Sequence, residues 1–319
     1  MDLVTLDDVR LAAKDLRGVA VRTPLLSCRW DDQLWVKPES LQPVGSFKVR
    51  GATHAVARLE PERRARGVVT HSSGNHGQAL AYAARVHGVP CTVVIPQGAP
   101  TVKVDQVRAL GAEVHLVPPA DRLTVAEQVA AERGSTLIPP FDDRRIIAGQ
   151  GTIGLEIVED LPEVDVVLVP VGGGGLASGV ATAVKALRPA ATVIGVEPEL
   201  AADARESLTA GELRVWEPAR TYRTSADGLR TNLSALTLAH LRVRLDGIVT
   251  VTEDEIAAAT ARLVQQTRLV VEPSGAVASA ARMFHAAELP AGRTVAVVSG
   301  GNVDPAVLAA AATRPDTDG

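Results

Sequence analysis

The stretch VVLVPVGGGGLASGVATAV, residues 166 to 184, decides how this chain folds. It opens with an apolar, valine-rich run, passes through four consecutive glycines, and ends in a segment of helical character. The stretch is long and apolar, but Pro170 and the glycines interrupt it where a membrane-spanning helix would need continuity. We therefore interpret it as a buried strand, a glycine loop and a helix.

Other valine-rich runs recur along the chain and have the same apolar character: GVVTHSS, PCTVVIP, AEVHLVP, TVIGVEP, GIVTVT and RTVAVVSG. Strands that are covered on both faces have this composition. Helix-like segments such as GQALAYAARVHG, TVAEQVAAERG and EDEIAAATARLVQQT separate the runs. This alternation predicts an α/β architecture with mainly parallel sheets.

Length, charge and cysteine content exclude several classes of function. A chain of 319 residues predicts one large domain or two closely joined ones. The net charge of -4 gives no support for nucleic acid or a membrane as partner. Cys28 and Cys91 lie far apart, so neither a disulfide framework nor a zinc site is predicted. The N-terminus lacks the basic start and apolar run of a signal peptide, so we expect a cytoplasmic protein.

The glycine loop within VGGGGLASG, residues 171 to 179, has the features of an anion site. Glycines let main-chain N–H groups approach a ligand closely, and the start of a helix favours negative charge. We interpret the loop as a phosphate cradle, with a tight strand-to-helix turn as the alternative. It is neither the GxGxxG dinucleotide pattern nor a GK[ST] nucleotide loop. A nucleotide-binding or dehydrogenase domain is the rival hypothesis, and it gives the lysine of the next motif no role.

Three further motifs indicate a cofactor site when they are considered together. Lys48 lies in GSFKVRG, residues 45 to 51, and alone it reads as an ordinary surface lysine. A polar loop in THSSGNHGQALAYAA, residues 70 to 84, suits a carboxylate or a ring oxygen, with helix N-capping as the alternative. VVSGGNVD, residues 297 to 304, delivers Ser299 at a strand end. An amine, a phosphate cradle, a polar loop and a serine meet the needs of pyridoxal phosphate.

The chain resembles the fold-type-II pyridoxal-phosphate enzymes, specifically the serine/threonine dehydratase and serine racemase family. The segments that carry the resemblance cover nearly the whole chain: SFKVRGA, SSGNHGQALA, IAGQGTIGLEI, VPVGGGGLASG, GVEPELAAD, SADGLRT, VVEPSGA and SGGNVD. The resemblance implies two open, mainly parallel twisted sheets flanked by helices, as in the tryptophan synthase β chain. It places the cofactor in the cleft between a large domain, residues 1–51 and 143–319, and a small mobile domain, residues 52–142. A homodimer is also implied.

The resemblance implies a cofactor role for individual residues. Lys48 bonds to the aldehyde of the cofactor, Phe47 flanks its ring, Asn75 hydrogen-bonds its ring oxygen and Ser299 faces the pyridine nitrogen. The residues implied to hold the phosphate are Gly172, Gly173, Gly174 and Gly175. A lysine near a cationic ring and away from water is expected to have a lowered pKa, which frees the amine as nucleophile and base.

The same motifs lead to a hypothesis about where an amino-acid substrate binds. Its carboxylate is expected on the loop that contains Ser72, Ser73, Asn75 and His76, with Arg122 joining when the cleft closes. The predicted reaction removes the β-hydroxyl of L-threonine or L-serine and yields a 2-oxo acid and ammonia. A serine racemase with dehydratase side activity is the alternative, because Ser73 lies where racemases of the family have serine. Another substrate such as 3-hydroxyaspartate is a further alternative.

Three positions outside these motifs refine the prediction. Phe141 in PPFDD replaces an asparagine of animal-type racemases, which favours dehydration. Glu272 in VVEPSGA is either a neighbour of the cofactor or a cap of the following helix. GVEPELAAD offers oxygen ligands that suit Mg²⁺ or Ca²⁺. The resemblance implies a structural, activating cation at these ligands, with a solvated acidic turn as the alternative, and they are Glu197, Ala201 and Asp203.

Overall fold

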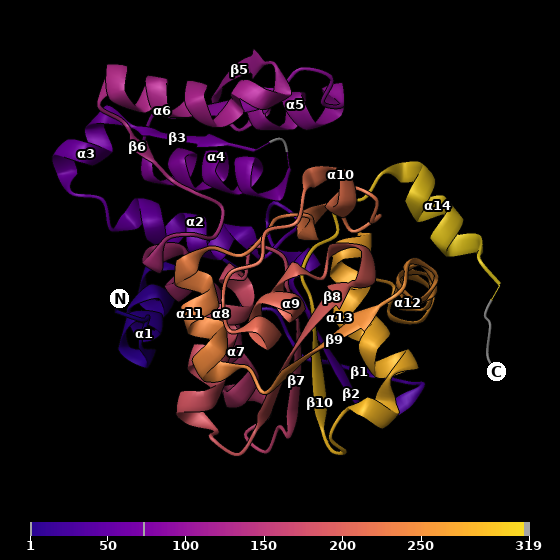
Figure 1. Cartoon of the computed structure of the whole chain (residues 1–319). Helices are drawn as coiled ribbons and strands as arrows, with labels where there is room; N and C mark the ends of the chain where they lie inside the picture. The colour runs from indigo at the N-terminus through magenta and orange to yellow at the C-terminus, as the bar shows by residue number, and fades with distance from the viewer. Residues whose placement is uncertain (1, 73, 316–319) are drawn as a thin grey trace.

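The computed structural model describes residues 2–72 and 74–315, and it contains two separate sheets (Figure 1). The larger sheet has the strand order β1-β2-β10-β7-β8-β9. All its neighbouring strands are parallel except β1 and β2. Its strands are β1 (Leu26–Cys28), β2 (Asp31–Pro38), β7 (Val166–Pro170), β8 (Thr192–Pro198), β9 (Gly247–Val251) and β10 (Thr294–Val298).

The smaller sheet has the order β5-β4-β3-β6, and its strands are all parallel. The strands are β3 (Val68–His71), β4 (Cys91–Pro96), β5 (Glu113–Val117) and β6 (Thr136–Leu137). Both sheets agree with the predicted α/β architecture. Three strands, β1, β2 and β6, are not predicted from the sequence. Strands β1 and β6 have only three and two residues, and the polar residues at the start of β2 hide its strand character. All four strands of the smaller sheet come from the segment 52–142, whose domain boundaries stay a prediction.

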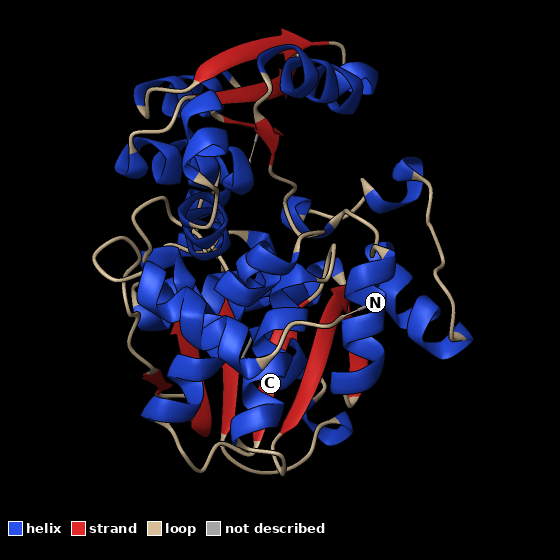
Figure 2. Cartoon of the chain, turned by 90° about the vertical axis from the view of Figure 1, so that its left-hand side faces the viewer, coloured by secondary structure: helices blue, strands red, loops and turns tan. Residues whose placement is uncertain are grey.

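Helices flank the sheets, as Figure 2 shows with the strands in red between layers of blue helices. Residue ranges of the α-helices are α1 (Leu6–Asp15), α2 (Lys48–Ala57), α3 (Pro61–Arg66), α4 (Asn75–His87), α5 (Thr101–Ala109), α6 (Arg122–Arg133), α7 (Arg144–Asp160), α8 (Gly175–Leu187), α9 (Asp203–Ala210), α10 (Pro218–Thr221), α11 (Ala235–Arg244), α12 (Glu253–Thr267), α13 (Pro273–Phe284) and α14 (Pro305–Thr313). The short 3-10 helices are η1 (Glu39–Leu41), η2 (Pro119–Asp121), η3 (Glu199–Ala201), η4 (Asp227–Leu229) and η5 (Ala286–Glu288). Within the described ranges, none of the helices combines the length and apolar character needed to cross a lipid bilayer.

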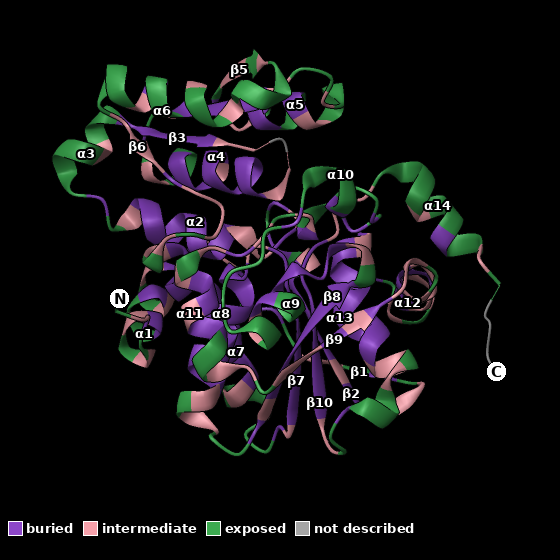
Figure 3. Ribbon diagram, viewed as in Figure 1, coloured by how far each residue is buried: buried purple, intermediate pink, exposed green. Residues whose placement is uncertain are grey.

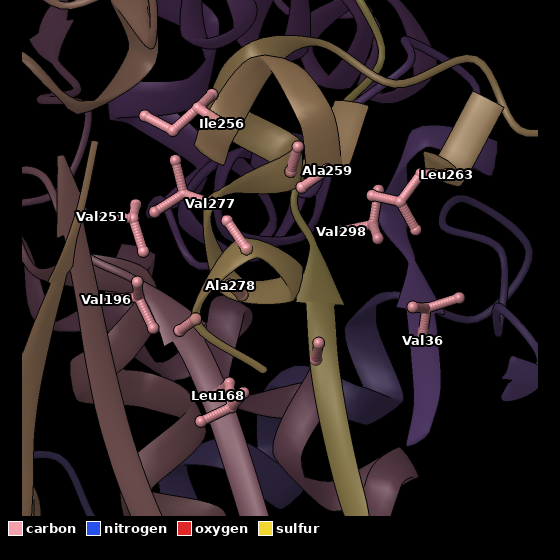
Figure 4. Close-up of a cluster of buried hydrophobic side chains, with 14 of the residues drawn as sticks. Val36, Leu168, Val196, Val251, Ile256, Ala259, Leu263, Val277, Ala278 and Val298 are labelled. Atoms are coloured by element: carbon pink, nitrogen blue, oxygen red, sulfur yellow. The ribbon is translucent and has the colours of Figure 1, made fainter. Parts of the chain in front are cut away.

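The central strand β7 explains why the valine-rich runs form buried strands. Every residue of β7 is buried, as the purple centre of the larger sheet shows in Figure 3. Leu168 belongs to the core on one face of the sheet, and Val167 and Val169 belong to the core on the other face. Side chains alternate along a strand, so a strand covered on both faces must be apolar at every position. Figure 4 shows Leu168 and Val196 in the first of these cores, near Val277 of α13.

Candidate active site

The ends of parallel strands bring the predicted motifs to one edge of the larger sheet. Strand β7 ends at Pro170 and leads into the glycine loop, and β10 ends just before Ser299. The segment before Lys48 pairs with the segment after β10 through a bridge between Ser46 and Gly300. Ligands of open α/β sheets bind outside the carboxyl ends of the strands, and the motifs lie at that place.

Lys48 is the first residue of α2, and its amine is held in a defined position. Its Nζ donates a hydrogen bond to the carbonyl oxygen of Pro140, 2.8 Å away, and lies 5.0 Å from the centroid of the Phe47 ring. Removal of the amine from water lowers the pKa of Lys48 from 10.5 to about 8. A larger fraction of this amine is therefore neutral near pH 7 than in an exposed lysine. Only the neutral amine can act as a nucleophile or base.

The glycine loop lies against Phe141 and opens α8. A Cβ on Gly173 would lie 2.4 Å from the Phe141 ring, and a Cβ on Gly175 would lie 2.9 Å from the Phe141 Cβ. Gly174 has a φ of +83°, a left-handed conformation that glycine adopts without strain. Any side chain would fill this cradle, whereas glycine leaves the first N–H groups of α8 available to an anion. The loop therefore fits a phosphate group.

The polar loop before α4 offers backbone and side-chain donors. Asn75 begins α4, and the Ser72 Oγ accepts a hydrogen bond from the Gly74 N–H at 3.3 Å. His76 is buried, and its Nε2 lies 3.0 Å from the carbonyl oxygen of Ile138. Burial and the charge of Lys48 lower the pKa of His76 to about 3, so its ring is neutral and donates to Ile138.

The remaining predicted substrate residues are less closely defined. Ser73 lies outside the described residues. Arg122 is half-buried at the start of α6, and its Nε donates to the carbonyl oxygen of Pro119 at 2.9 Å. Burial and the charge of Arg122 lower the pKa of His71, which precedes Ser72 in the chain. Arg122 thus contributes positive potential at the end of β3, and its closure over a substrate stays a prediction.

Ser299 presents a neutral hydroxyl at the end of β10. It is buried, and its Oγ donates to the carbonyl oxygen of Ser274 at 3.3 Å. Its own carbonyl accepts a hydrogen bond from the Phe47 N–H at 3.0 Å, which ties β10 to the segment before Lys48. The Oγ of Ser46 is buried, and within the described part of the chain it has no hydrogen-bond partner. An unpaired buried hydroxyl here is what a site for a polar ligand provides.

Glu272 and Asn302 both contact Asn75, and the sequence does not predict either contact. Glu272 makes no side-chain cap on α13, and its Oε1 instead accepts a hydrogen bond from the Asn75 Nδ2 at 2.8 Å. Asn302 Nδ2 donates to the Asn75 Oδ1 at 2.7 Å. In the sequence Glu272 is an acidic residue followed by proline, and this pattern is equally typical of a helix start.

The candidate cation site lies at the end of β8. Glu197 and Asp203 are both fully buried, and Ala201 lies between them at the end of η3. Glu197 accepts hydrogen bonds from the N–H groups that follow Asp203, whereas the Asp203 Oδ1 has no partner among the described residues. Burial raises the pKa of Asp203 to about 7, and burial together with the Asp203 charge raises that of Glu197 well above 4.5.

The donor set at this site fits a hard cation. Among the described residues there is no group of three or more His, Cys, Asp or Glu side chains that could hold a metal ion. The set therefore consists of two carboxylates and the backbone carbonyl of Ala201. Such all-oxygen ligands are those that Mg²⁺ and Ca²⁺ prefer, and a cation would satisfy the free Asp203 oxygen.

Fold and site together define a pyridoxal-phosphate enzyme of fold type II. The chain matches the family described as "Pyridoxal-phosphate dependent enzyme" over residues 17–300, and it belongs to that family. It is 41% identical over 310 residues to an L-threonine ammonia-lyase of Thermotoga maritima, covering 95% of this chain and 76% of the relative. It is 38% identical over 314 residues to an L-threo-3-hydroxyaspartate ammonia-lyase of Saccharomyces cerevisiae, covering 95% of each chain.

A solved structure supports the same fold. The crystal structure of serine racemase from Dictyostelium discoideum superposes with a TM-score of 0.88 at 39% identity, covering 94% of this chain and 99% of that one. The predicted fold class and the predicted enzyme family are thereby confirmed, together with pyridoxal phosphate as the cofactor of the family. Both ammonia-lyases and a racemase occur among the similar proteins, so the reaction has to be argued from the site.

Proposed function

We propose that the protein is an ammonia-lyase that removes the β-hydroxyl of L-threonine or L-serine and produces a 2-oxo acid and ammonia. The observation that carries the proposal is the Lys48 amine, which is desolvated and held 2.8 Å from the carbonyl oxygen of Pro140. Phe141 follows Pro140 and packs on the glycine loop, at the position where the sequence favours dehydration. The threonine ammonia-lyase relative supports the same reaction.

Several residues are proposed to hold the cofactor. Asn75 would bond to the ring oxygen, Ser299 would face the ring nitrogen and Phe47 would flank the ring. The phosphate would bind to the N–H groups of Gly172, Gly173, Gly174 and Gly175. When bound, pyridoxal phosphate supplies an aldehyde that bonds to amines and a ring that withdraws electrons from the substrate's α-carbon.

The chain's own residues would then bind the substrate and move protons. The N–H groups at the start of α4, with Ser72, Ser73 and Asn75, would hold the substrate carboxylate, because a helix N-terminus favours an anion. The neutral His76 ring adds no charge, so Arg122 would supply the positive charge as the cleft closes. Neutral Lys48 would take the α-proton. Removal of the α-proton and the β-hydroxyl, together the elements of one water molecule, leaves an enamine. Hydrolysis of the enamine by one water molecule yields the 2-oxo acid and ammonia.

Replacement of one lysine tests the proposal. Lys48→Ala is expected to abolish turnover of threonine and serine and the visible absorbance of the bound cofactor. Lys14→Ala, on the exposed end of α1, is the matched control and should keep both. Borohydride reduction followed by peptide mapping should place the cofactor on the peptide that contains Lys48. A label on a different lysine, or normal turnover by Lys48→Ala, would refute the assignment.

Racemisation is the second candidate function, because a structurally similar protein is a serine racemase. It requires a second acid or base on the opposite substrate face, and Ser73 is the residue we propose for that role. Chiral analysis of serine, run beside an assay for 2-oxo acids, separates the two reactions. Rapid formation of D-serine with little pyruvate would make racemisation the main activity. The same assays with 3-hydroxyaspartate test the third substrate class, which the yeast relative's name suggests.

We also propose a structural Mg²⁺ or Ca²⁺ on Glu197, Ala201 and Asp203, supported by the unpaired Asp203 oxygen.

The segment 52–142 is proposed to move as a small domain relative to residues 1–51 and 143–319. We further propose a homodimer, which the family resemblance implies, and a location in the cytoplasm, which the two separate cysteines fit. Sedimentation equilibrium of the purified enzyme tests the dimer, and a monomer at assay concentrations would contradict it.

A further inference from the structure

Four segments meet at the side chain of Asn75. Its Nδ2 donates to the Glu272 Oε1 at 2.8 Å, and its Oδ1 accepts from the Asn302 Nδ2 at 2.7 Å. Asn302 Nδ2 also donates to the carbonyl oxygen of Val44 at 2.8 Å. We call these four residues the Asn75 junction. It joins the start of α4 to the segment before Lys48, the start of α13 and the loop after β10.

The junction permits one orientation of the Asn75 amide. Both N–H groups of the Asn302 amide are donors, and the Val44 carbonyl fixes which end of that amide faces Asn75. The Asn75 oxygen must therefore face Asn302, and its nitrogen must face the Glu272 carboxylate. An asparagine amide has two N–H donors, and Glu272 accepts from this nitrogen. Within residues 2–72 and 74–315 no second acceptor bonds to this nitrogen, so its other N–H is available to a ligand.

Close packing confines the side chains of Glu272 and Asn302. Glu272 is 5% exposed, and a Cβ on Gly300 would lie 2.4 Å from its Oε1. A Cβ on Gly45, which has a φ of +70°, would lie 2.5 Å from the Asn302 Oδ1. The two glycines thus leave the space that the carboxyl and amide groups fill. Side chains confined in this way hold a neighbour in position at little entropic cost on binding.

The charged groups around Glu272 come from several elements. Asp227 of η4 and Lys103 of α5 face it, and these two form an ion pair at 3.5 Å. Burial, with the Asp227 charge, raises the pKa of Glu272 to about 7, while the bond from Asn75 and the charge of Lys103 oppose the rise. Asn302 contributes a backbone N–H to the same carboxyl group. The carboxyl therefore accepts hydrogen bonds from two segments of the junction.

We propose that Glu272 and Asn302 are positioning residues that aim the free N–H of Asn75 at the ring oxygen of pyridoxal phosphate. The proposal rests on the proposed function only through the contact of Asn75 with the cofactor. Glu272 and Asn302 act through Asn75, so their effect on cofactor binding should require the Asn75 side chain.

Titration of the cofactor into the full-length apoprotein tests this dependence. The dissociation constant for pyridoxal phosphate is measured by tryptophan fluorescence, and the absorbance maximum of the bound cofactor is recorded over pH. Asn302→Asp is the main variant, because it keeps the volume of the side chain and removes the N–H donors. We expect about tenfold weaker binding and a shifted pH midpoint of the absorbance, as loss of a buried hydrogen bond produces.

The same change in an Asn75→Ala background provides the decisive comparison. If Asn302 acts through Asn75, Asn302→Asp should weaken binding by less than about twofold in that background. Equal weakening in both backgrounds, or unchanged binding in the otherwise natural chain, would overturn the proposal. Circular dichroism of each variant identifies loss of folding, and Asn302→Ala serves as a second variant should the aspartate variant not fold.

Glu272 has a conservative variant and a matched control. Glu272→Gln keeps an oxygen acceptor and should bind the cofactor nearly as the natural chain does, whereas Glu272→Ala should weaken binding about tenfold. Glu217→Gln changes an exposed glutamate that also precedes a proline at a helix start, and it should change nothing. A Glu272→Ala protein with natural affinity and absorbance would contradict the role of Glu272. These measurements do not depend on turnover, so their outcome is independent of whether the protein catalyses the ammonia-lyase reaction.

Discussion

Gly149 of α7 crosses Gly51 of α2 so closely that a Cβ on Gly149 would lie 2.5 Å from the Cα of Gly51. Helix α2 begins at Lys48, and α7 also packs on α8, which begins in the glycine loop. Helix α7 therefore stands between the element that carries the amine and the element that is proposed to carry the phosphate. The close contact between Gly51 and Gly149 therefore sets the distance between the Lys48 amine and the proposed phosphate site.

Substitution at this crossing should disturb both stability and cofactor binding. Gly149→Ala is expected to destabilise the protein by about 1–3 kcal/mol, because the added methyl group meets the backbone of α2. Displacement of α2 should also weaken binding of pyridoxal phosphate. Urea unfolding and cofactor titration measure the two effects. Gly247→Ala is the control, because its Cβ would meet no atom closer than 3.6 Å, and an equal loss in both variants would contradict the explanation.

A buried ion network also joins α2 to α7. Arg50 is almost fully buried, and it donates to Glu39 at 2.7 Å and to Glu156 of α7 at 2.6 Å. Arg50→Met should destabilise the protein by about 3–5 kcal/mol, because it leaves buried carboxylates with less compensating charge. Arg10→Met removes an exposed pair with Asp7 and should have little effect. Comparable unfolding midpoints for the two variants would argue against the network's importance.

The network also predicts a direction of acid sensitivity. Burial alone would raise the pKa of Glu156, but Arg50 and Lys37 outweigh it, so the net pKa lies below 4.5. The folded state then binds fewer protons than the unfolded chain, and this stability is present above pH 4.5 and is lost as pH falls below it. Glu156→Gln should show a smaller loss of unfolding free energy over that range than the natural chain. An unchanged slope would contradict the prediction.

The amine of Lys48 should titrate near pH 8 in the apoprotein. Its pKa is lowered to about 8 by desolvation, so its reaction with a small amine-specific reagent should be half-maximal near that pH. Lys14 provides an exposed comparison within the same molecule. Competitive labelling over pH, followed by peptide mapping, measures both residues at once. A Lys48 midpoint near 10.5, the ordinary value, would show that the amine is not desolvated.

The proposed cation site predicts a pH-dependent stabilisation. The folded protein without cation keeps a proton on Asp203 up to about pH 7, whereas the ordinary pKa is 3.8, so stability falls as pH rises through this window. A divalent cation should restore stability and release protons when it binds. Thermal unfolding with Mg²⁺, Ca²⁺ or a chelator measures the first effect, and titration calorimetry in two buffers measures the second.

A matched pair of substitutions controls for general salt effects. Asp203→Asn should abolish the response to both cations, since it removes a proposed ligand and the charge that raises the pKa of Glu197. Asp254→Asn, on the exposed face of α12, should respond as the natural chain does. If the natural protein's unfolding temperature were insensitive to cations and chelator, the site would be a buried acidic turn without a ligand.

Local features of the sequence predicted the order of the elements and the position of the glycine loop. The stretch 166–184 does form β7, a loop and α8, because apolar runs and glycines act through the backbone within a few residues. The polar start of β2 concealed a strand, since pairing with β10 rather than composition forms it. Eight motifs that occur in the same order as in the family were enough to indicate the enzyme class, because each motif is a short segment whose structure depends on neighbouring residues.

Only the tertiary structure decided which polar side chains are buried together. Glu272 lies 197 positions from Asn75, and Arg50 lies 106 positions from Glu156, so no local pattern could pair them. By composition each of these charged residues belongs on the surface. Burial becomes favourable only when the fold brings a partner to each charge and hydrogen-bonding group, and that depends on helix and strand contacts across the whole chain. The sequence thus determined the class of site, and the packing of distant segments determined how its groups are held.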